Sequence, residues 1–268
     1  MRIALLQHDI VWEDPAANHQ QVAVHLERAA RGGAELVVLP EMFATGFSMA
    51  AERVAEPTDG PTRRFLAAAA RDLNLGILAG IAVHSAEGRP RNCAVFLGPD
   101  GACFSQTKLH PFSGADEGRY FEPGGAVGTF QFRGLRVTPF ICYDLRFPEI
   151  FRVAADHTDL FVVIASWPAR RRAHWRPLLL ARAIENQAYV AGVNRIGEGG
   201  GLSYAGDTVL YDPWGEALLS PEPEVESLGF AEVDPARVAE VRGSFPALKD
   251  RRPEAYRVEG APPRPSAP

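Results

Sequence analysis

Cysteine is scarce in this chain, and its few thiols do not have the spacing of a shared site. The sequence holds 268 residues and 3 cysteines, Cys93, Cys103 and Cys142, with no CxxC pair. An odd count without that spacing is typical of reduced thiols in an intracellular protein, and it argues against a disulfide framework or a zinc site. We therefore expect no structural metal.

The sequence also lacks an excess of positive charge and a long apolar run. Its formal net charge is -5 at pH 7, so no basic surface is predicted for a nucleic-acid backbone. The first residues, 1–9 (MRIALLQHD), place polar side chains too early for the core of a signal peptide. No apolar run is long enough to span a bilayer. We expect a cytoplasmic protein that binds neither nucleic acid nor membrane.

What the chain does have is a regular alternation of strands and helices. A buried strand at 2–7, a helix that starts after Asp14-Pro15 and ends at Gly32-Gly33, and a strand at 35–39 form a βαβ pattern. No composition shift marks an internal boundary. The sequence predicts one α/β domain with mixed sheets over residues 1–249, followed by a proline-rich tail, 250–268, that is an extended arm or disordered.

The remaining segments follow the same alternation. Further strands are expected at 77–83, 92–97, 102–106, 137–141, 160–165, 189–193, 208–211 and 228–233, and further helices at 61–74, from 148, from about 172 to 187, and from 235. Residues 112–125, a stretch without periodicity, are expected to form a functional loop, and a glycine run occupies residues 197–201.

Cys142 stands at the most informative position of the chain. It follows an apolar strand, and Pro148 marks the start of a helix just after Phe147. A strand-to-helix elbow of this kind exposes a nucleophile at the carboxyl end of a strand, where ligands bind in α/β folds and a nearby helix N-terminus favours the thiolate. A small buried thiol is the competing interpretation.

Three further residues offer the chemistry that a cysteine nucleophile needs. Glu41 also follows an apolar strand, Lys108 closes the strand of a hairpin, and Glu117 lies in the aperiodic loop. Each alone is typical of a solvated surface charge. Together they supply a proton acceptor, a cation for a developing oxyanion and a proton for a departing amine.

Histidine is the usual alternative base for a cysteine nucleophile. The candidates are His110, His157 and His174. None is placed beside Cys142 by a sequence motif, so a Cys-His pair is the weaker of the two mechanisms.

Three segments in order resemble the signature motifs of the nitrilase superfamily of carbon-nitrogen hydrolases. They are Leu39–Phe47 (LPEMFATGF), Gln106–His110 (QTKLH) and Phe140–Glu149 (FICYDLRFPE). The resemblance implies a four-layer α-β-β-α sandwich that dimerises through the helices beside the nucleophile. It also implies hydrolysis without a cofactor.

The resemblance further implies a role for each site residue. Cys142 is the nucleophile that becomes acylated, Glu41 the general base and acid, and Lys108 the cation that stabilises the oxyanion. Tyr143 contributes its backbone N–H to the oxyanion hole, and Glu117 falls where the family carries a second, positioning glutamate.

Within that superfamily the chain is most similar to the omega-amidase group, which hydrolyses the terminal amide of 2-oxoglutaramate and 2-oxosuccinamate. The similarity rests on the segments 165–168 (ASWP), 181–187 (ARAIENQ) and 212–216 (DPWGE). Pro177 departs from the expected pattern, because a helix that starts near residue 172 has to begin later or kink there. This puts the geometry of a dimer interface in doubt more than the chemistry.

An arginine-rich segment follows the strand 160–165 and suggests an anionic substrate. Cations at a helix start oppose the helix dipole, so another interaction is expected to offset them. The candidates for binding a substrate carboxylate are Arg146, Arg170, Arg171, Arg172 and Arg195, and Trp167 is a further candidate substrate-binding residue. A solvated turn, or an ion pair of Arg146 with Glu149, is the plainer alternative for any single arginine.

The sequence thus predicts an amidase that works through a thioester on a small-molecule amide. The alternatives are another carbon-nitrogen hydrolase, such as an N-carbamoyl amine amidohydrolase or a deaminated-glutathione-type amidase, and a catalytically silent interaction protein. The intact set of Glu41, Lys108 and Cys142 argues against the silent protein.

Overall fold

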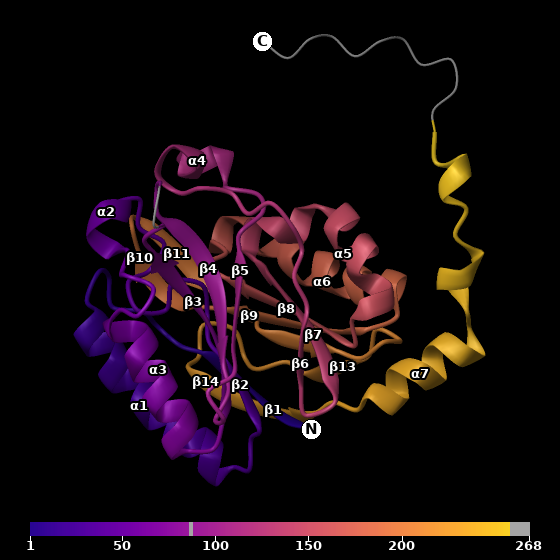
Figure 1. Ribbon diagram of the computed structural model, residues 1–268, viewed down its shortest axis with the longest axis horizontal. Coiled ribbons are helices and arrows are strands. Elements are labelled where there is room, and N and C mark those ends of the chain that lie inside the picture. Colours follow the sequence, from indigo (N-terminus) through magenta and orange to yellow (C-terminus); the bar gives the residue numbers. More distant parts are fainter. Residues whose placement is uncertain (86–87, 258–268) are drawn as a thin grey trace.

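Two six-stranded sheets pack face to face in this computed structural model, which describes residues 1–85 and 88–257 (Figure 1). The strands of the first sheet are, in spatial order, β14 (Ser227–Glu232), β1 (Arg2–Gln7), β2 (Leu36–Val38), β3 (Gly76–Val83), β4 (Arg91–Leu97) and β5 (Cys103–Thr107). Those of the second are β13 (Ala217–Leu219), β12 (Val209–Tyr211), β9 (Tyr189–Asn194), β8 (Leu160–Ala165), β7 (Leu135–Ile141) and β6 (Phe130–Phe132).

Three central strands of each sheet run parallel. They are β1, β2 and β3 in the first sheet and β7, β8 and β9 in the second, and antiparallel strands complete the edges. Residues that directly follow parallel strands emerge at the same edge of a sheet. The segments after β2, β7 and β8 therefore lie at common ends of the two sheets.

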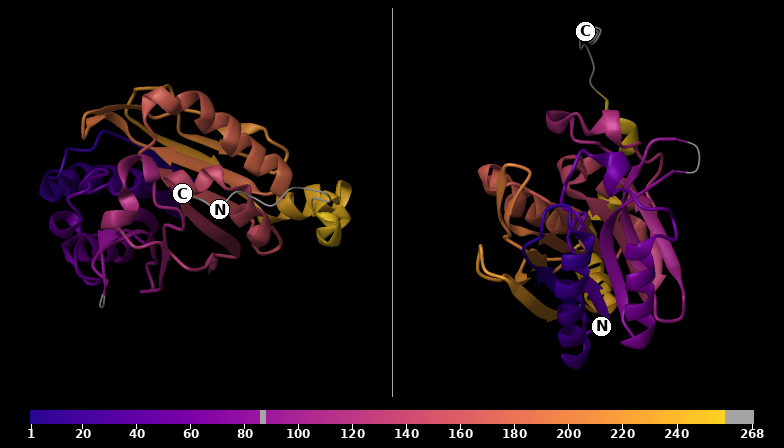
Figure 2. Two further views of the ribbon diagram at one scale, coloured as in Figure 1. Left: turned by 90° about the horizontal axis from the view of Figure 1, so that it is seen from above. Right: turned by 90° about the vertical axis from the view of Figure 1, so that its left-hand side faces the viewer.

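Helices cover the outer face of each sheet. They are α1 (Pro15–Arg31) and α3 (Pro61–Asp72) on the first sheet, and α5 (Pro148–Ala154) and α6 (Arg172–Asn186) on the second. Figure 2 shows these helices on opposite sides of the paired sheets. The other α-helices of the described residues are α2 (Ala51–Val54), α4 (Glu117–Tyr120) and α7 (Pro235–Ser244).

The side chains of the central strands alternate between two cores, which explains why these strands are largely apolar. Leu36 and Val38 of β2 point into the core between the sheets, where they meet second-sheet residues such as Val162. Val37 points the other way, to a core shared with helix residues such as Leu26 of α1. A third core packs α5 and α6 on the second sheet. These three cores separate four layers and confirm the predicted sandwich.

The strands and long helices lie close to their predicted positions, but the hairpin over residues 196–205 was not predicted and the stretch 112–125 is not a continuous loop. The glycine run 197–201 is the tip of a hairpin of β10 (Ile196–Gly199) and β11 (Leu202–Ala205). The stretch 112–125 contains a 3-10 turn, Ser113–Ala115, and α4. The elements α2, β6 and β13 were not predicted. Of the predicted tail, residues 253–255 form a 3-10 turn, and residues 258–268 lie outside the described residues.

Pro177 lies inside α6, which begins at Arg172 and continues through it. A proline has no N–H to donate to the carbonyl four residues earlier, here that of Ala173. Ala173 is exposed, so water can reach that carbonyl. The helix therefore does not begin at the proline. In the part of the chain that the structure describes, no helix is long and apolar enough to cross a membrane.

Candidate active site

The structure brings Glu41, Lys108, Glu117 and Cys142 together at the ends of the two sheets. Glu41 lies after β2, Lys108 directly after β5, Cys142 directly after β7, and Glu117 at the start of α4. Glu41, Lys108 and Glu117 are buried, and Cys142 is partly buried. The plainer alternative, that each of these three charges is a solvated surface residue, is therefore wrong.

Lys108 is held between the two carboxyl groups and is only 1% exposed. Its Nζ lies 2.9 Å from Glu41 Oε1 and 2.9 Å from Glu117 Oε2. Asn92 Nδ2 donates to the same two side chains, at 2.8 Å to Glu41 Oε1 and 3.1 Å to Glu117 Oε1. Burial opposes the charge of Lys108, but Glu117 and Glu41 outweigh it and raise the pKa of the ammonium. Lys108 is thus a fixed cation.

Glu41 and Glu117 are each fastened to backbone amides as well. Ser166 N, just after β8, donates to Glu41 Oε2 at 2.8 Å, which ties the two sheets together at the site. Phe112 N donates to Glu117 Oε2 at 2.6 Å and closes the loop before α4. These bonds fix the orientation of both carboxyl groups.

The backbone around Glu41 requires a glycine on the neighbouring strand. A Cβ at Gly80 of β3 would lie 2.5 Å from the Cα of Glu41 and 2.5 Å from Met42 N. Met42 itself has φ 46°, a left-handed conformation that few residues other than glycine adopt. Gly80 therefore allows β3 to approach the turn that presents Glu41.

Cys142 has φ 49° and opens a 3-10 turn, Cys142–Arg146, ahead of α5 at Pro148. Asp144 secures this turn, because its buried carboxylate accepts hydrogen bonds from Ile141 N at 3.1 Å and from His110 N at 2.8 Å. The second bond reaches the segment just after Lys108. The elbow is thus held to the strand end that carries the cation.

The thiol of Cys142 is not a resting thiolate. Burial raises its pKa well above the usual value, the negative charge of Glu41 raises it further, and the Lys108 charge opposes this only in part. The expectation that a helix N-terminus favours the thiolate was wrong, because a short 3-10 turn rather than a helix follows the sulfur. Attack by Cys142 therefore requires a base, and Glu41 is within electrostatic reach.

The three histidines do not occupy that position. His110 Nδ1 lies 2.9 Å from Asp144 Oδ1, and the ring stacks on Phe147. His174 Nδ1 bonds Arg146, and His157 lines a separate surface hollow. None of the three is among the described residues that line the cavity at Cys142.

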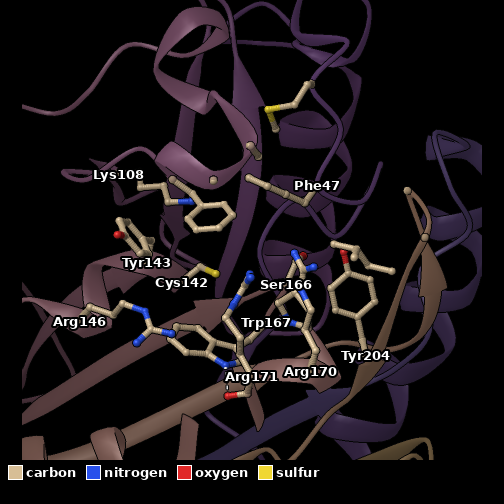
Figure 3. A pocket seen from close by; sticks show the side chains of 18 of the residues that line it. Phe47, Lys108, Cys142, Tyr143, Arg146, Ser166, Trp167, Arg170, Arg171 and Tyr204 are labelled. Atoms are coloured by element: carbon tan, nitrogen blue, oxygen red, sulfur yellow. Dashed lines mark hydrogen bonds between the residues drawn. The ribbon is translucent and has the colours of Figure 1, made fainter. Parts of the chain in front are cut away.

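A cavity of about 240 Å³ opens over Cys142 (Figure 3). Its polar lining comprises Lys108, Tyr143, Arg146, Ser166, Arg170, Arg171 and Tyr204, and its apolar lining includes Trp12, Phe47, Met49, Phe112, Trp167 and Leu202. Glycines 199 and 200, at the tip of the β10–β11 hairpin, complete one wall. The cavity can thus hold a small molecule with polar and apolar parts.

The predicted substrate-binding residues divide into two groups. The cavity is lined by Arg146, Trp167, Arg170 and Arg171. The Arg146 guanidinium lies over the Trp167 ring at 4.7 Å, and it is hydrogen-bonded to His174 rather than paired with Glu149. Arg195 does not line the cavity. Its guanidinium is fully buried and bonded to Asp9 Oδ1 at 2.7 Å.

Two arginines of the cavity, Arg170 and Arg171, have guanidinium groups without an ion pair or hydrogen bond among the described residues, but Arg170 is exposed, whereas Arg171 is partly buried. The Arg171 guanidinium lies over the Phe112 ring at 4.8 Å. Burial lowers its pKa, and the charge of Arg170 lowers it further. An anion in the cavity would offset this uncompensated charge.

Sequence reasoning missed several residues of the site. Asn92 appeared only as part of a strand, although it bridges both carboxyl groups. Ser166 directly follows a parallel strand, and that position was the signal that could have identified it. No local pattern indicated Trp12 or Tyr204, because both reach the cavity only through the tertiary fold.

Known proteins resemble this chain over nearly its whole length. Residues 2–243 match the carbon-nitrogen hydrolase family. The chain is 38% identical to omega-amidase YafV of Escherichia coli K12 over 93% of this chain and 96% of that protein. It is 33% identical to 2-oxoglutaramate amidase of Bacillus subtilis, with 95% and 98% covered.

Among solved structures, XC1258 from Xanthomonas campestris superposes with a TM-score of 0.89 at 36% identity, with 94% of this chain and 97% of that one covered. It is described as a CN-hydrolase superfamily protein with an arsenic adduct in the active site. The fold, the matched family and these relatives agree. The chain belongs to the carbon-nitrogen hydrolase family.

Proposed function

We propose that the protein is an omega-amidase, which hydrolyses the terminal carboxamide of a small 2-oxo dicarboxylic acid through a thioester at Cys142. The observation that carries the proposal is the buried Lys108, held between Glu41 and Glu117 in the same cavity as the thiol and the unpaired Arg171. The names of the relatives, omega-amidase and 2-oxoglutaramate amidase, support the substrate class.

In the first half-reaction, Glu41 takes the thiol proton as the sulfur bonds to the carboxamide carbon. The developing oxyanion is stabilised by Lys108 Nζ and the backbone N–H of Tyr143. When this intermediate collapses, the carbon–nitrogen bond breaks, and Glu41 returns the proton to the departing nitrogen. Ammonia leaves and a thioester remains.

In the second half-reaction, water replaces ammonia. Glu41 takes a proton from the water as its oxygen bonds to the thioester carbon, and the same two donors stabilise the oxyanion. The carbon–sulfur bond then breaks and the thiol recovers its proton. Glu117 acts as a positioning residue, because it holds Lys108 and Phe112 N without reaching the reacting atoms. No cofactor takes part in this sequence.

Arg171 is the residue that we assign to the substrate carboxylate. Its guanidinium is free and partly buried at the cavity, whereas that of Arg170 is exposed, Arg195 is bonded elsewhere and Arg172 pairs with Asp207 at 2.8 Å. A hydrogen-bonded ion pair contributes about 1.5–3 kcal/mol, which corresponds to roughly a 10- to 150-fold change in kcat/KM. Arg146 and Arg170 add positive charge at the same wall.

An ammonia-release assay over a panel of amides tests the proposal. We expect 2-oxoglutaramate and 2-oxosuccinamate to be hydrolysed with a far higher kcat/KM than propionamide. Arg171→Gln should remove most of that preference while sparing propionamide, and Arg28→Gln, at an exposed position of α1, serves as the matched control. Equal efficiency on all three amides, or a clear preference for an N-carbamoyl amine, would refute the assignment.

We also propose that the protein forms a homodimer through α5 and α6. Val153 on α5 is 70% exposed and Ile184 on α6 is 53% exposed, while Leu179 and Ala183 on the opposite side of α6 are buried. Light scattering at micromolar concentration should give the mass of a dimer. A monomer alone would refute this proposal and leave the chemistry untouched.

A further inference from the structure

Tyr204 presents a hydroxyl group to the cavity that the proposed reaction does not use. The residue lies in β11 and is only 3% exposed, yet it lines the cavity over Cys142 (Figure 3). None of the described residues exchanges a hydrogen bond with its oxygen. A buried hydroxyl without a partner is unfavourable unless a ligand or water completes it.

The ring of Tyr204 is held in place by Arg195, whose guanidinium lies over it at 4.5 Å. Arg195 is 0% exposed. It donates to Asp9 Oδ1 at 2.7 Å and to the carbonyls of Ile10 and Glu198 at 3.1 Å and 2.8 Å. These bonds fasten β10 to the segment after β1. Arg195, expected to bind substrate, instead supports a residue that faces it.

The hairpin backbone contributes to the same rigidity. Gly197 pairs with Tyr204 across β10 and β11 and has φ 78°. A Cβ at Gly197 would overlap the carboxylate of Asp9. The hairpin therefore packs closely on the segment of Asp9 and Ile10, to which Arg195 is bonded. The phenol of Tyr204 has a defined position in the lining of the cavity.

Tyr204 is an uncharged hydrogen-bond donor, whereas the lysine and arginines that line the same cavity are charged donors. Burial raises the pKa of Tyr204 to about 12, although the charges of Arg195 and Arg171 oppose this. The hydroxyl therefore stays protonated at neutral pH. A neutral hydroxyl suits an uncharged oxygen acceptor, whereas a carboxylate is better matched by a guanidinium.

We propose that Tyr204 determines specificity by donating a hydrogen bond to the 2-oxo oxygen of the substrate. This inference rests on the proposed function. In a 2-oxo acid the keto oxygen lies on the carbon next to the carboxylate. Arg171 and Tyr204 are near enough for the charge of one to act on the other, so both neighbouring groups can be met at once. A substrate without the oxo group would leave the phenol unpaired.

The test compares 2-oxoglutaramate with glutaramate, which has the same amide and carboxylate but no oxo group. Tyr204→Phe keeps the ring over Arg195 and removes only the oxygen. We expect kcat/KM of the variant to fall about tenfold on 2-oxoglutaramate, the size of one hydrogen bond, and to change little on glutaramate. Tyr211→Phe, at another buried tyrosine in β12, is the matched control and should change neither value.

Three other outcomes would each contradict the assignment of Tyr204 to the 2-oxo oxygen. Equal losses on both substrates would mean that the hydroxyl acts on water or on the common machinery. No loss on either would mean that it binds nothing that matters to the reaction. If the wild-type enzyme released ammonia from neither compound, the proposed function itself would be refuted, and the assignment of Tyr204 would fall with it.

Discussion

Replacing Lys108 by methionine tests the central ion cluster most directly. Methionine has nearly the same length but no charge, so the change leaves Glu41 and Glu117 buried without the ammonium that lies 2.9 Å from each. Of the described residues, only Asn92, through Nδ2, and the backbone amides of Ser166 and Phe112 would still donate to them. The variant should lose activity, because the oxyanion loses its cation, and it should also lose stability.

The size of the stability loss follows from the burial. Removing one partner of a buried ion pair costs about 3–5 kcal/mol, because an uncompensated charge remains. For a chain of this length each kcal/mol lowers the melting temperature by roughly 2 °C, so we expect a drop of about 6–10 °C. Lys249→Met, at an exposed lysine, is the matched control and should change the free energy of unfolding by less than about 0.5 kcal/mol.

Urea unfolding of single and double variants separates the stabilising role from the catalytic one. Adding Glu117→Gln to Lys108→Met removes one of the two uncompensated carboxyl groups, so the double variant should recover part of the lost free energy of unfolding. It should still be inactive, because the cation is absent. A Lys108→Met protein as stable as the wild type would refute the reasoning, since the ammonium would then contribute no net stability to the cluster.

Three further predictions concern other parts of the molecule. Cys142→Ala and Glu41→Gln should each abolish ammonia release with the fold intact, and the double variant should be little worse than either, because the two act as a unit; near-normal rates in Glu41→Gln would contradict the mechanism. His8 has its pKa lowered by burial from 6.5 to about 3, so the unfolded chain binds a proton in that window and the folded chain does not. As pH falls from 6.5 towards 3, stability should drop by about 1.4 kcal/mol per unit, and urea unfolding of His8→Gln should show a correspondingly smaller slope. Gly80→Ala should reduce kcat and lower the unfolding free energy by about 1–3 kcal/mol, because the added Cβ displaces the Glu41 backbone; crystals of the variant with an unmoved Glu41 would contradict this.

The sequence was sufficient to predict the residues that lie at strand ends. Glu41 and Cys142 each follow an apolar strand, and parallel strands deliver such residues to one edge, whereas Lys108 closes β5, an antiparallel strand at the edge of the first sheet. Their environment could not be predicted in the same way. The raised pKa of Cys142 depends on how deeply the sulfur is buried and on its distance from two carboxyl groups, and both are properties of the assembled sandwich.

The residues proposed to bind the substrate were harder to predict than those of the catalytic centre. Arg195 directly precedes β10 and Tyr204 lies in β11 of the same hairpin, and only the packing of that hairpin decides which side chain faces the cavity. The glycine run 197–201 has no periodicity, so the hairpin itself was missed. Arg171 was correctly placed near the site because it follows β8, but neighbouring arginines were equally plausible candidates until their partners were known.

The burial of Lys108 also has a practical consequence. Lys108 and Lys249 are the only lysines of the sequence, and the first is enclosed by carboxyl groups while the second is exposed after α7. Lysine-directed coupling to a surface or a dye should therefore attach at Lys249. The coupling should spare Lys108 and leave the cavity over Cys142 unmodified and open to substrate.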